Sequence, residues 1–476
     1  MPGYDVSIGL ETHVQLKTRS KLFCSCSTRF GEEPNTNICP VCLGYPGALP
    51  VVNFEAVRLS VVTGLMLGCR INLQSKFDRK NYFYPDMPKN YQISQYDQPL
   101  CTGGSVEIEV DGKVKRIRLR RIHLEEDVGK SFHFGGSSGV DFNRAGIPLM
   151  EIVTEPEICS ADEAYAYLVA LKAVLEYGAV SDCNLEEGNV RCDVNCSVRK
   201  HGRSGELGTK TEIKNLNTFR GVQRALKYEI ARQIRVLAGG GTIEQQTLRW
   251  DDEKGITVAL RSKEYAHDYR YFPEPDIPPV VLGPQQVEAW RDSLPELPSL
   301  RKRRFLRQYG LPEYDAGVLV AERDVADFFE RIVEAGAEPK AASNWVMTEV
   351  LRAMGASGKT LADLGLMPEG LARLISLVER GTVNMPTAKE VFAVMLETGE
   401  DPERIVRERG LAQVTDVSEL RGVVERVLAA HQKVAADYRA GKEAALQFLI
   451  GQVMRQTRGK ADPKAAARIL RERLGG

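Results

Sequence analysis

Four cysteines in two closely spaced pairs constrain the fold of this 476-residue chain more than any other feature. One residue separates Cys24 from Cys26, two separate Cys39 from Cys42, and twelve lie between the pairs. Four thiolates at such spacing can close a tetrahedral zinc site. We expect a structural zinc knuckle within residues 22–44, because protein ligands fill all four positions. Free thiols or a disulfide are the alternatives.

The segment before the cysteines has the pattern of a half-buried strand. Residues 4–16 alternate between apolar and polar side chains. Glu11 and His13 are two residues apart and therefore project from the same face. A carboxylate beside an imidazole suits a metal ion or a proton-transfer pair. From this segment alone, a solvated strand face is the alternative.

A tyrosine- and proline-rich segment at residues 77–100 has too little periodicity for an ordinary helix or strand. We expect a shaped loop there, and such loops often carry function. Its Lys80, Tyr82 and Lys89 are suited to holding a phosphate or stacking on a base. A surface loop pinned by proline is the alternative. A second tyrosine-proline segment lies at residues 265–276.

Residues 104–124 predict a β-hairpin, because alternating apolar residues flank an Asp-Gly turn. The second arm runs into a histidine and three consecutive acids. On simple alternation His123, Glu125 and Asp127 share one face of the strand. Glu126 then lies on the opposite face. Adjacent acids repel one another, so a nearby cation is a natural reason for them, with a solvated acidic loop as the alternative.

Further polar groups occur within apolar strands. Glu151 is the one carboxylate in the apolar run 147–153. Unless it faces an open edge, it must pair, bind a metal or become neutral. Asp193 lies on the polar side of the alternating residues 190–198, and Lys214 ends another alternating segment. A sheet whose strands share such a polar face is suited to be a catalytic wall.

The 64 basic and 64 acidic residues cancel, so a nucleic-acid partner must be met by local basic patches. Proline-rich residues 273–298 mark a boundary, after which short helices continue. We expect an α+β protein with a mixed α/β domain at 1–295, a helical domain at 296–405 and a helical tail at 406–476. The last part of the tail carries excess positive charge, which suits an RNA backbone or simply a solvated helix face.

No apolar run approaches the roughly 18 residues that a membrane span needs, and no signal peptide is evident. With ten cysteines, we therefore expect a cytoplasmic protein with reduced or metal-bound thiols. There is no P-loop or Rossmann fingerprint, so ATP, if used, is held by another device. The Gly/Ser segment 134–139 invites comparison with amidase nucleophile loops, but such short matches are common in flexible loops.

Many long words of sequence, in order along almost the whole chain, resemble a single family. They are IGLETHVQL, the two cysteine pairs, CLGYPGALPVVN, SKFDRKNYFYPDMPKNYQISQYDQP, RIHLEED, DFNRAGIPLMEIVTEP, EEGNVRCDVN, TEIKNLNTF and AHDYRYFPEPDIPP. Together they resemble the B subunits of aspartyl/glutamyl-tRNA amidotransferases. The resemblance implies an α/β cradle, a helical domain and a helical tail, the last two gripping tRNA.

The resemblance also implies a ligase activity within a three-subunit complex. An amidase A subunit releases ammonia from glutamine, and a small C subunit wraps the other two. The B subunit uses ATP and Mg²⁺ to phosphorylate the side chain of misacylated Glu-tRNA(Gln), in many organisms also Asp-tRNA(Asn). Ammonia then displaces the phosphate. The alternatives are a non-catalytic tRNA-binding scaffold in the same complex, or a chain that is itself the glutaminase.

Matched to the family's motifs, four residues are expected to form the magnesium and phosphoryl-transfer site: Glu11, His13, Glu126 and Glu151. The further catalytic candidates are Glu125, Asp193, Lys80 and Tyr82. The candidates for holding ATP are Lys80, Lys89 and Lys214. Since histidine is an unusual magnesium ligand, His13 is alternatively a base for ammonium. Alternation favours Glu125 over Glu126, and only a bulge or strand end reconciles it with the motif.

Overall fold

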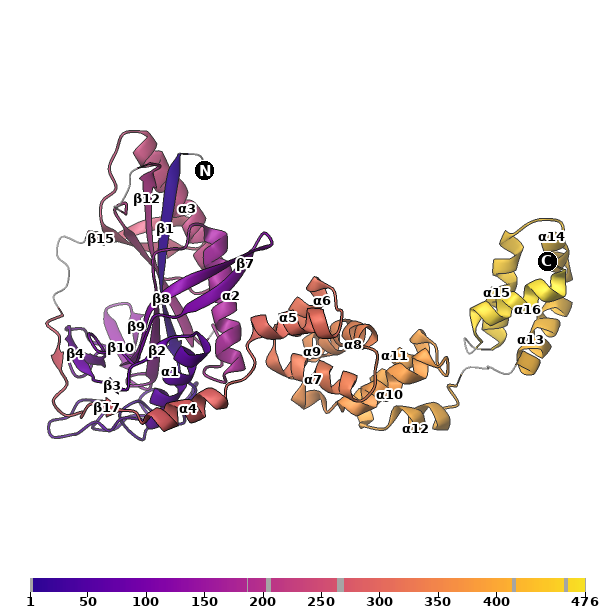
Figure 1. Ribbon diagram of the computed structural model, residues 1–476, viewed down its shortest axis with the longest axis horizontal. Helices are drawn as coiled ribbons and strands as arrows, with labels where there is room; N and C mark the ends of the chain where they lie inside the picture. The colour runs from indigo at the N-terminus through magenta and orange to yellow at the C-terminus, as the bar shows by residue number, and fades with distance from the viewer. Residues whose placement is uncertain are drawn as a thin grey trace. The chain divides into compact units, whose positions relative to one another are not determined.

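The computed structural model describes residues 3–185, 187–202, 207–262, 269–412, 417–457 and 461–475. The chain divides into two compact units, Met1–Leu300 and Arg301–Gly476 (Figure 1). The first unit contains all the strands that are described, and the second is helical. The α+β class expected from the sequence is therefore confirmed at the level of a mixed α/β region followed by a helical region.

A ten-stranded sheet forms the frame of the first unit. Its central strand is β1 (Tyr4–Gln15), which pairs antiparallel with β11 (Pro148–Thr154) and β12 (Val190–Lys200). On the β11 side follow β8 (Lys113–Glu126), β6 (Cys101–Thr102) and β2 (Arg70–Ile71), with β7 (Ser105–Val110) also paired to β8. On the β12 side follow β13 (Thr211–Lys214), β14 (Gln246–Asp251) and β15 (Ile256–Ser262).

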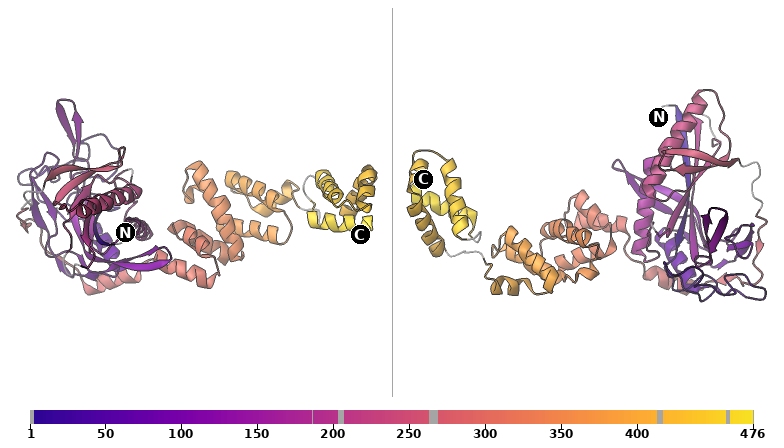
Figure 2. Two further views of the ribbon diagram at one scale, coloured as in Figure 1. Left: turned by 90° about the horizontal axis from the view of Figure 1, so that it is seen from above. Right: turned by 180° about the vertical axis from the view of Figure 1, so that it is seen from behind.

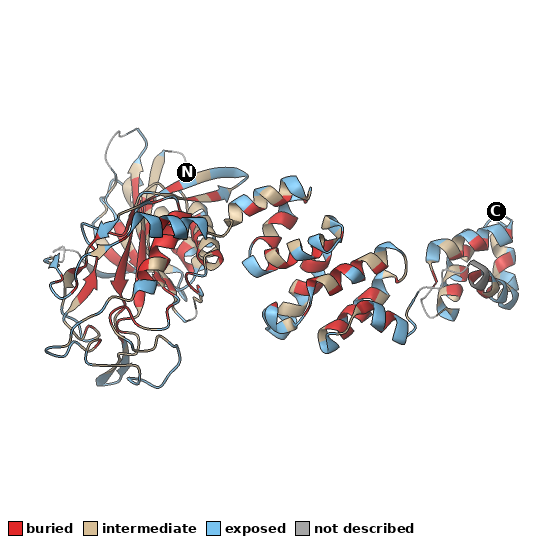
Figure 3. Ribbon diagram, turned by 60° about the horizontal axis from the view of Figure 1, so that its bottom comes forward, coloured by how far each residue is buried: buried red, intermediate tan, exposed pale blue. Residues whose placement is uncertain are grey.

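The alternation expected for the N-terminal strand is present. Ile8, Leu10 and Val14 are buried in the main apolar core, while Glu11 and His13 project from the opposite face. Two helices that pack on each other, α2 (Ala161–Tyr177) and α3 (Phe219–Ala238), also pack on strands of the sheet (Figures 1 and 2). Figure 3 shows the buried residues gathered where helices and sheet meet.

The remaining helices of this unit are α1 (Phe54–Met66) and α4 (Pro284–Asp292). The side chains of Asn53 and Ser160 cap the first turns of α1 and α2 by accepting backbone N–H donors. Such caps satisfy amide groups that have no partner inside the helix. They fix where the two helices begin, and the chain that precedes α1 carries the cysteine cluster.

The hairpin expected at residues 104–124 is present as β7 and β8. Asp111 and Gly112 have φ values of 51° and 71°, the left-handed conformation that a tight two-residue hairpin turn requires. A second hairpin, β9 (Lys130–Phe134) with β10 (Ser137–Asp141), contains the Gly/Ser segment. Strand β8 continues to Glu126 and so carries its acids directly into the sheet.

The expectation of a loop without strands at residues 77–100 is wrong. This segment contains β4 (Asp78–Asn81) and β5 (Tyr91–Ser94), which pair antiparallel. The distant β16 (Phe272–Pro273) pairs with the other edge of β4. Short strands among prolines and tyrosines leave no periodicity, so only long-range pairing reveals them. Of the second tyrosine-proline segment, residues 265–268 lie outside the described residues.

A last pair of two-residue strands joins β3 (Gln74–Ser75) to β17 (Val280–Val281). Together with β16, it ties residues 272–281 back onto the segment that follows α1. Residues far apart in sequence are thereby paired side by side.

Helix α5 (Pro298–Gln308) crosses the boundary between the units. The second unit then continues with the helices α6 (Glu313–Leu319), α7 (Arg323–Glu334), α8 (Pro339–Trp345), α9 (Leu351–Ser357), α10 (Pro368–Glu379), α11 (Met385–Thr398), α12 (Pro402–Glu408), α13 (Val417–Ala430), α14 (Gln432–Arg439), α15 (Ala444–Gln456) and α16 (Pro463–Leu474). A π-helical turn (Val346–Val350) and a 3₁₀ turn (Ala362–Leu364) lie between α8 and α10.

Two apolar clusters stabilise this unit. One lies within residues 305–406 and centres on Phe305, Phe329 and Trp345. The other lies within residues 420–474. Separate clusters are what two domains divided near residue 405 require, and that division stays a prediction. No helix in the described parts of the chain is long and apolar enough to cross a membrane.

Candidate catalytic and metal sites

Three neighbouring strands bring a row of polar side chains together on the face of the sheet opposite the core. In the register of β1 with β11, His13 lies opposite Glu151, and in the register of β11 with β8, Glu151 lies opposite His123. Directly opposed residues of antiparallel strands share a face and have closely spaced Cβ atoms. The sheet order therefore creates a row of imidazole, carboxylate and imidazole.

Glu125 completes this group from β8. The Nε2 atom of His13 lies 3.6 Å from a carboxylate oxygen of Glu125 and 3.6 Å from one of Glu151. One ligand atom from each of the three residues lies within 4.8 Å of the other two. The Nε2 atom of His123 lies 3.2 Å from Glu151. We call His13, His123, Glu125 and Glu151 the acid–imidazole cluster.

The cluster fits a divalent cation by the chemistry of its donors. Glu125 and Glu151 are buried, and burial alone would raise the pKa of Glu151. The neighbouring His123, His13 and Lys80 instead hold that pKa below its ordinary value, so the carboxylate is ionised at neutral pH. Carboxylate oxygens suit Mg²⁺ or Mn²⁺, and an imidazole nitrogen suits the softer of the two.

Glu126, expected from the family motif to join this group, lies elsewhere. Its carboxylate accepts hydrogen bonds from Lys89 Nζ at 2.7 Å and from the Ile93 backbone N–H at 2.9 Å. The structure does not bring it together with His13. From Arg121 to Glu126 the register of β8 with β11 is continuous, so consecutive side chains there point to opposite faces, as alternation predicts.

Glu11 lies two residues before His13 on the same face of β1 and has different hydrogen-bond partners. Its carboxylate accepts a hydrogen bond from the Asn195 side chain at 2.9 Å. Burial and the nearby carboxylates of Glu151 and Asp193 raise the pKa of Glu11. Asp193 in turn accepts a hydrogen bond from Lys214 Nζ at 2.6 Å. Glu11, Asp193 and Lys214 thus extend the polar wall beyond the acid–imidazole cluster.

Lys80 faces the same region from β4. Burial would lower its pKa, but Glu125, Tyr271 and Glu151 raise it, so the side chain stays charged. Its ammonium lies 5.2 Å from the ring centre of Tyr269, within the range of a cation–π contact. Tyr82 lies near the acids too, and burial together with nearby carboxylates raises its pKa.

Two tyrosines that were not among the candidate site residues reach this region from the second tyrosine-proline segment. Tyr269 and Tyr271 lie on residues 269–276, which we call the strap. Arg79 holds the strap by donating to Glu274 at 2.7 and 2.9 Å, with its guanidinium 4.2 Å from the Tyr91 ring. The repeated tyrosine-proline composition was the one signal for it.

His123 was not among the candidate site residues, although alternation placed it on the right face. It is 2% exposed, and its Nδ1 atom has no hydrogen-bond partner among the described residues. Asp127, at the end of the same run, is bonded to Arg191 and Gln15 instead. The histidine's position two residues before Glu125 was the available signal.

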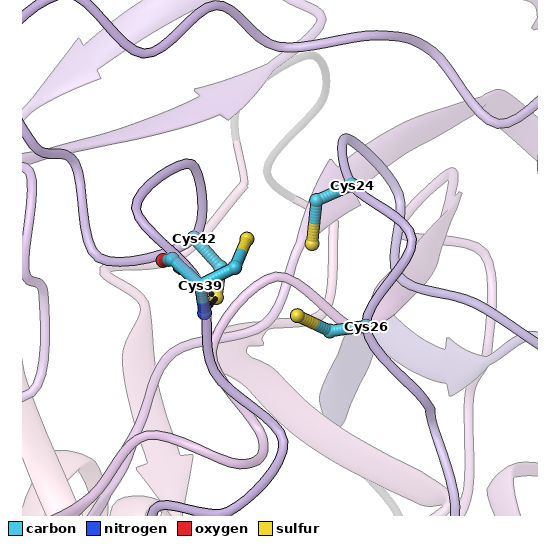
Figure 4. Close-up of side chains that lie close together, drawn as sticks. All are labelled: Cys24, Cys26, Cys39 and Cys42. Atoms are coloured by element: carbon cyan, nitrogen blue, oxygen red, sulfur yellow. Dashed lines mark hydrogen bonds between the residues drawn. The ribbon is translucent and has the colours of Figure 1, made fainter.

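The four cysteines gather as the spacing predicted, their side chains converging from two loops (Figure 4). Their sulfur atoms all lie within 4.8 Å of one another, and all four thiols are free. A tetrahedral zinc with Zn–S bonds of about 2.3 Å places sulfurs about 3.8 Å apart. Hydrogen bonds from the Cys24 thiol and the Cys39 backbone, with Lys21 nearby, lower the pKa of Cys42 to about 4. The donor set therefore fits zinc.

The Gly/Ser segment does not form an amidase-like nucleophile loop. Ser138 Oγ lies 2.9 Å from His133 Nδ1, but both residues are on an exposed two-stranded hairpin. A nucleophile and base also need a third group that orients the base. None is recorded for this pair among the described residues, so the glutaminase alternative has no support here.

Comparisons with known proteins show the family of the chain. A family model described as the GatB/GatE catalytic domain matches residues 6–288, which include every member of the acid–imidazole cluster. A second, described as the GatB domain, matches residues 327–474. The chain belongs to the family of aspartyl/glutamyl-tRNA amidotransferase B subunits. The resemblance found in its sequence motifs is thereby confirmed.

Relatives of this B-subunit family match over the full length. Proteins named as B subunits of aspartyl/glutamyl-tRNA(Asn/Gln) amidotransferases, from Carboxydothermus hydrogenoformans and Thermoanaerobacter pseudethanolicus, are 52% and 54% identical to this chain. The first alignment covers 100% of this chain and 99% of the relative, and the second covers 99% of each. The relative from Brevibacillus brevis is 49% identical over 476 residues.

Proposed function

We propose that this chain is the ATP-dependent kinase and transamidase of a tRNA-dependent amidotransferase. Its substrate is Glu-tRNA(Gln), and Asp-tRNA(Asn) where the cell makes it. A side-chain oxygen attacks the γ-phosphorus of ATP, giving an acyl phosphate and ADP. Ammonia then attacks the acyl carbon, inorganic phosphate leaves and a proton is lost. The products are Gln-tRNA(Gln) and Asn-tRNA(Asn).

The acid–imidazole cluster carries this proposal. A carboxylate is a poor electrophile and must be activated, and phosphoryl transfer is mainly positioning and neutralisation of charge. His13, Glu125 and Glu151 would hold the magnesium ion, which when bound neutralises charge on phosphate oxygens. Glu125 thus replaces Glu126 in the ligand set that the motif implied, and Glu11, which is bonded to Asn195, remains a candidate ligand beside them. An alternative for His13 is to accept a proton from ammonium.

Lys80 is the lysine best placed to meet a phosphate. Lys89 is bonded to Glu126, and Lys214 to Asp193, so each already has a carboxylate partner. For Lys80, no ion pair within 4.0 Å is recorded among the described residues. Its ammonium can therefore turn toward an incoming phosphate without breaking a salt bridge. Lys89 and Lys214 remain candidates for holding ATP.

The partners follow from the name of the relatives, which are B subunits of an amidotransferase. We propose an amidase A subunit that releases ammonia from glutamine and a small C subunit, forming a heterotrimer. The helical region would hold tRNA, with the basic residues of the tail meeting its phosphates. Within this proposal the protein acts in cytoplasmic protein synthesis, and its cysteine cluster holds a structural zinc.

ATP cleavage by the chain co-purified with its A and C partners tests the proposal. With ammonium supplied, we expect cleavage that requires Glu-tRNA(Gln) and is absent with uncharged tRNA. The variants Glu125→Gln and His13→Ala are expected to lose it, while Glu109→Gln, a change on the hairpin strand β7, is the matched control.

Undiminished product formation by both site variants would contradict the kinase assignment. It would favour the alternative, a scaffold that only binds tRNA. The buried carboxylates speak against that alternative, because a surface that grips RNA needs positive charge and gains nothing from acids.

A further inference from the structure

The side chain of Lys21 is completely buried, with 0% of its surface exposed. Within the described residues its Nζ atom lies 3.7 Å from the Cys42 sulfur and 3.2 Å from the Phe142 carbonyl oxygen. No carboxylate of the described residues is recorded within 4.0 Å of Nζ. A buried ammonium without an anionic partner costs several kcal/mol. The Cys42 sulfur is the one group in contact that can supply negative charge.

The proposed zinc site, in turn, requires positive charge or hydrogen-bond donors near its sulfur atoms. Four cysteine thiolates around Zn²⁺ leave a net charge of about −2, which burial penalises unless donors face the sulfurs. One donor to Cys42 is the Cys39 backbone N–H at 3.1 Å. The Lys21 ammonium is another, and among the described residues it is the contact that brings a full positive charge.

The backbone at Lys21 also links the cysteine cluster to the segment that precedes β11. Its backbone N–H donates to the Cys26 carbonyl at 2.9 Å, and the next residue, Leu22, donates to Gly146 at 2.8 Å. A small pocket of about 60 Å³ is lined by Lys21 together with Cys42, Lys89 and Glu126. Lys21, which contacts the Cys42 sulfur, therefore lines the same pocket as the Lys89–Glu126 pair.

We infer that Lys21 is the counter-ion of the zinc-bound Cys42 thiolate and a positioning residue of the knuckle. This rests on the proposed zinc site. The lysine neutralises part of the excess negative charge and orients the sulfur, so the metal is held more tightly than by four thiolates alone. Outer partners of metal ligands typically change metal affinity by about 10- to 100-fold.

The test measures zinc retention by the full chain, co-purified with its partner subunits. Lys21→Met keeps the side-chain volume and removes the charge. We expect the variant to release Zn²⁺ to a competing chelator at a concentration about 10- to 100-fold lower than wild type. Lys17→Met is the control, since Lys17 is exposed and pairs with Asp182.

A pair of variants separates charge from packing. Lys21→Arg keeps the positive charge and is expected to retain zinc within about threefold of wild type, whereas neutral Lys21→Gln is expected to lose it as Lys21→Met does. Replacement of zinc by Co²⁺ in each variant reports by absorption whether four thiolates still bind. This comparison remains decisive if the methionine variant fails to fold.

Equal zinc retention by the arginine and glutamine variants would overturn the assignment of Lys21, while leaving the zinc site intact. Wild-type protein without zinc would overturn both the zinc proposal and this inference. Loss of catalysis with zinc retention unchanged would likewise count against a counter-ion role.

Discussion

Glu125 and Glu126 are neighbours in sequence, yet their carboxylates lie on opposite faces of strand β8. That of Glu125 lies 3.6 Å from His13, and that of Glu126 bonds to Lys89 at 2.7 Å. Glu125 thus belongs to the proposed phosphoryl-transfer site, whereas Glu126 neutralises Lys89 on the other face of the strand. Their replacements have different expected consequences.

Glu125→Gln removes a proposed metal ligand, so we expect ATP cleavage to fall by about 100-fold or more and the Mg²⁺ needed for half-maximal rate to rise. Glu126→Gln leaves Lys89 without its anionic partner and is expected to cost about 3 kcal/mol of stability. Its Mg²⁺ requirement should stay that of wild type. A Mg²⁺ titration of both variants decides, and an equal shift in the two would contradict the assignment.

Glu11→Gln is expected to stabilise the protein while slowing the reaction. The raised pKa of Glu11, caused by burial and by Glu151 and Asp193, means that its ionised form opposes folding at neutral pH. We expect about 1 kcal/mol of added stability at pH 7. The gain should vanish as the pH falls below about 4.3, where the carboxyl is protonated in folded and unfolded chains alike. Urea unfolding at several pH values measures it.

Glu229 provides the opposite pH dependence. Burial would raise its pKa, but hydrogen bonds from Arg232, Gln233 and Thr211 lower it. A lowered folded-state pKa adds stability above the unfolded pKa of about 4.3, and this is lost as pH falls through the folded value. We expect Glu229→Gln to cost about 3 kcal/mol at pH 7 and progressively less in acid. A difference independent of pH would contradict this.

Removal of the proposed zinc should destabilise the first unit. Treatment with a strong chelator, or Cys39→Ser with Cys42→Ser, is expected to lower the free energy of unfolding by about 3 kcal/mol or more. Cys159→Ser, at an exposed cysteine outside the cluster, is the control and should have no effect. Thermal unfolding together with metal analysis checks both. Unaltered stability of the double variant would remove the case for a structural zinc.

Arg79→Lys tests the strap that carries Tyr269 and Tyr271. Lysine cannot make both hydrogen bonds to the buried Glu274, so we expect a loss of about 2 kcal/mol. Because the strap places Tyr269 beside Lys80, the proposed phosphate-binding lysine, we also expect a raised KM for ATP. The matched control is Arg70→Lys, at an exposed residue of β2. If KM and stability both match those of the control, the strap does not depend on Arg79.

A structural feature can be predicted from the sequence when the residues that determine it are close together along the chain. The period of two in β1 and β8 is local, and it correctly separated Glu125 from Glu126 where the motif alone did not. The spacing of Cys24, Cys26 and Cys39 likewise predicted a cluster, because short loops limit where thiols can lie. Membership of the family was also contained in the sequence motifs.

The segment at 77–100 shows the limit of local patterns. Its strands β4 and β5 pair with each other, and β4 also pairs with β16, which lies about 190 residues further along the chain. Proline and tyrosine hide the alternation, so no window of a few residues contains the signal.

The sequence by itself determined which side chains share a strand face and which cysteines meet. Only the tertiary structure decided that His13, Glu151 and His123 form one row, because the order and register of β1, β11 and β8 are set by contacts between distant residues. It also brought Lys80 to the acids and buried Lys21 against a thiol. Burial and charge pairing depend on what surrounds a residue in space, and a linear pattern does not specify that.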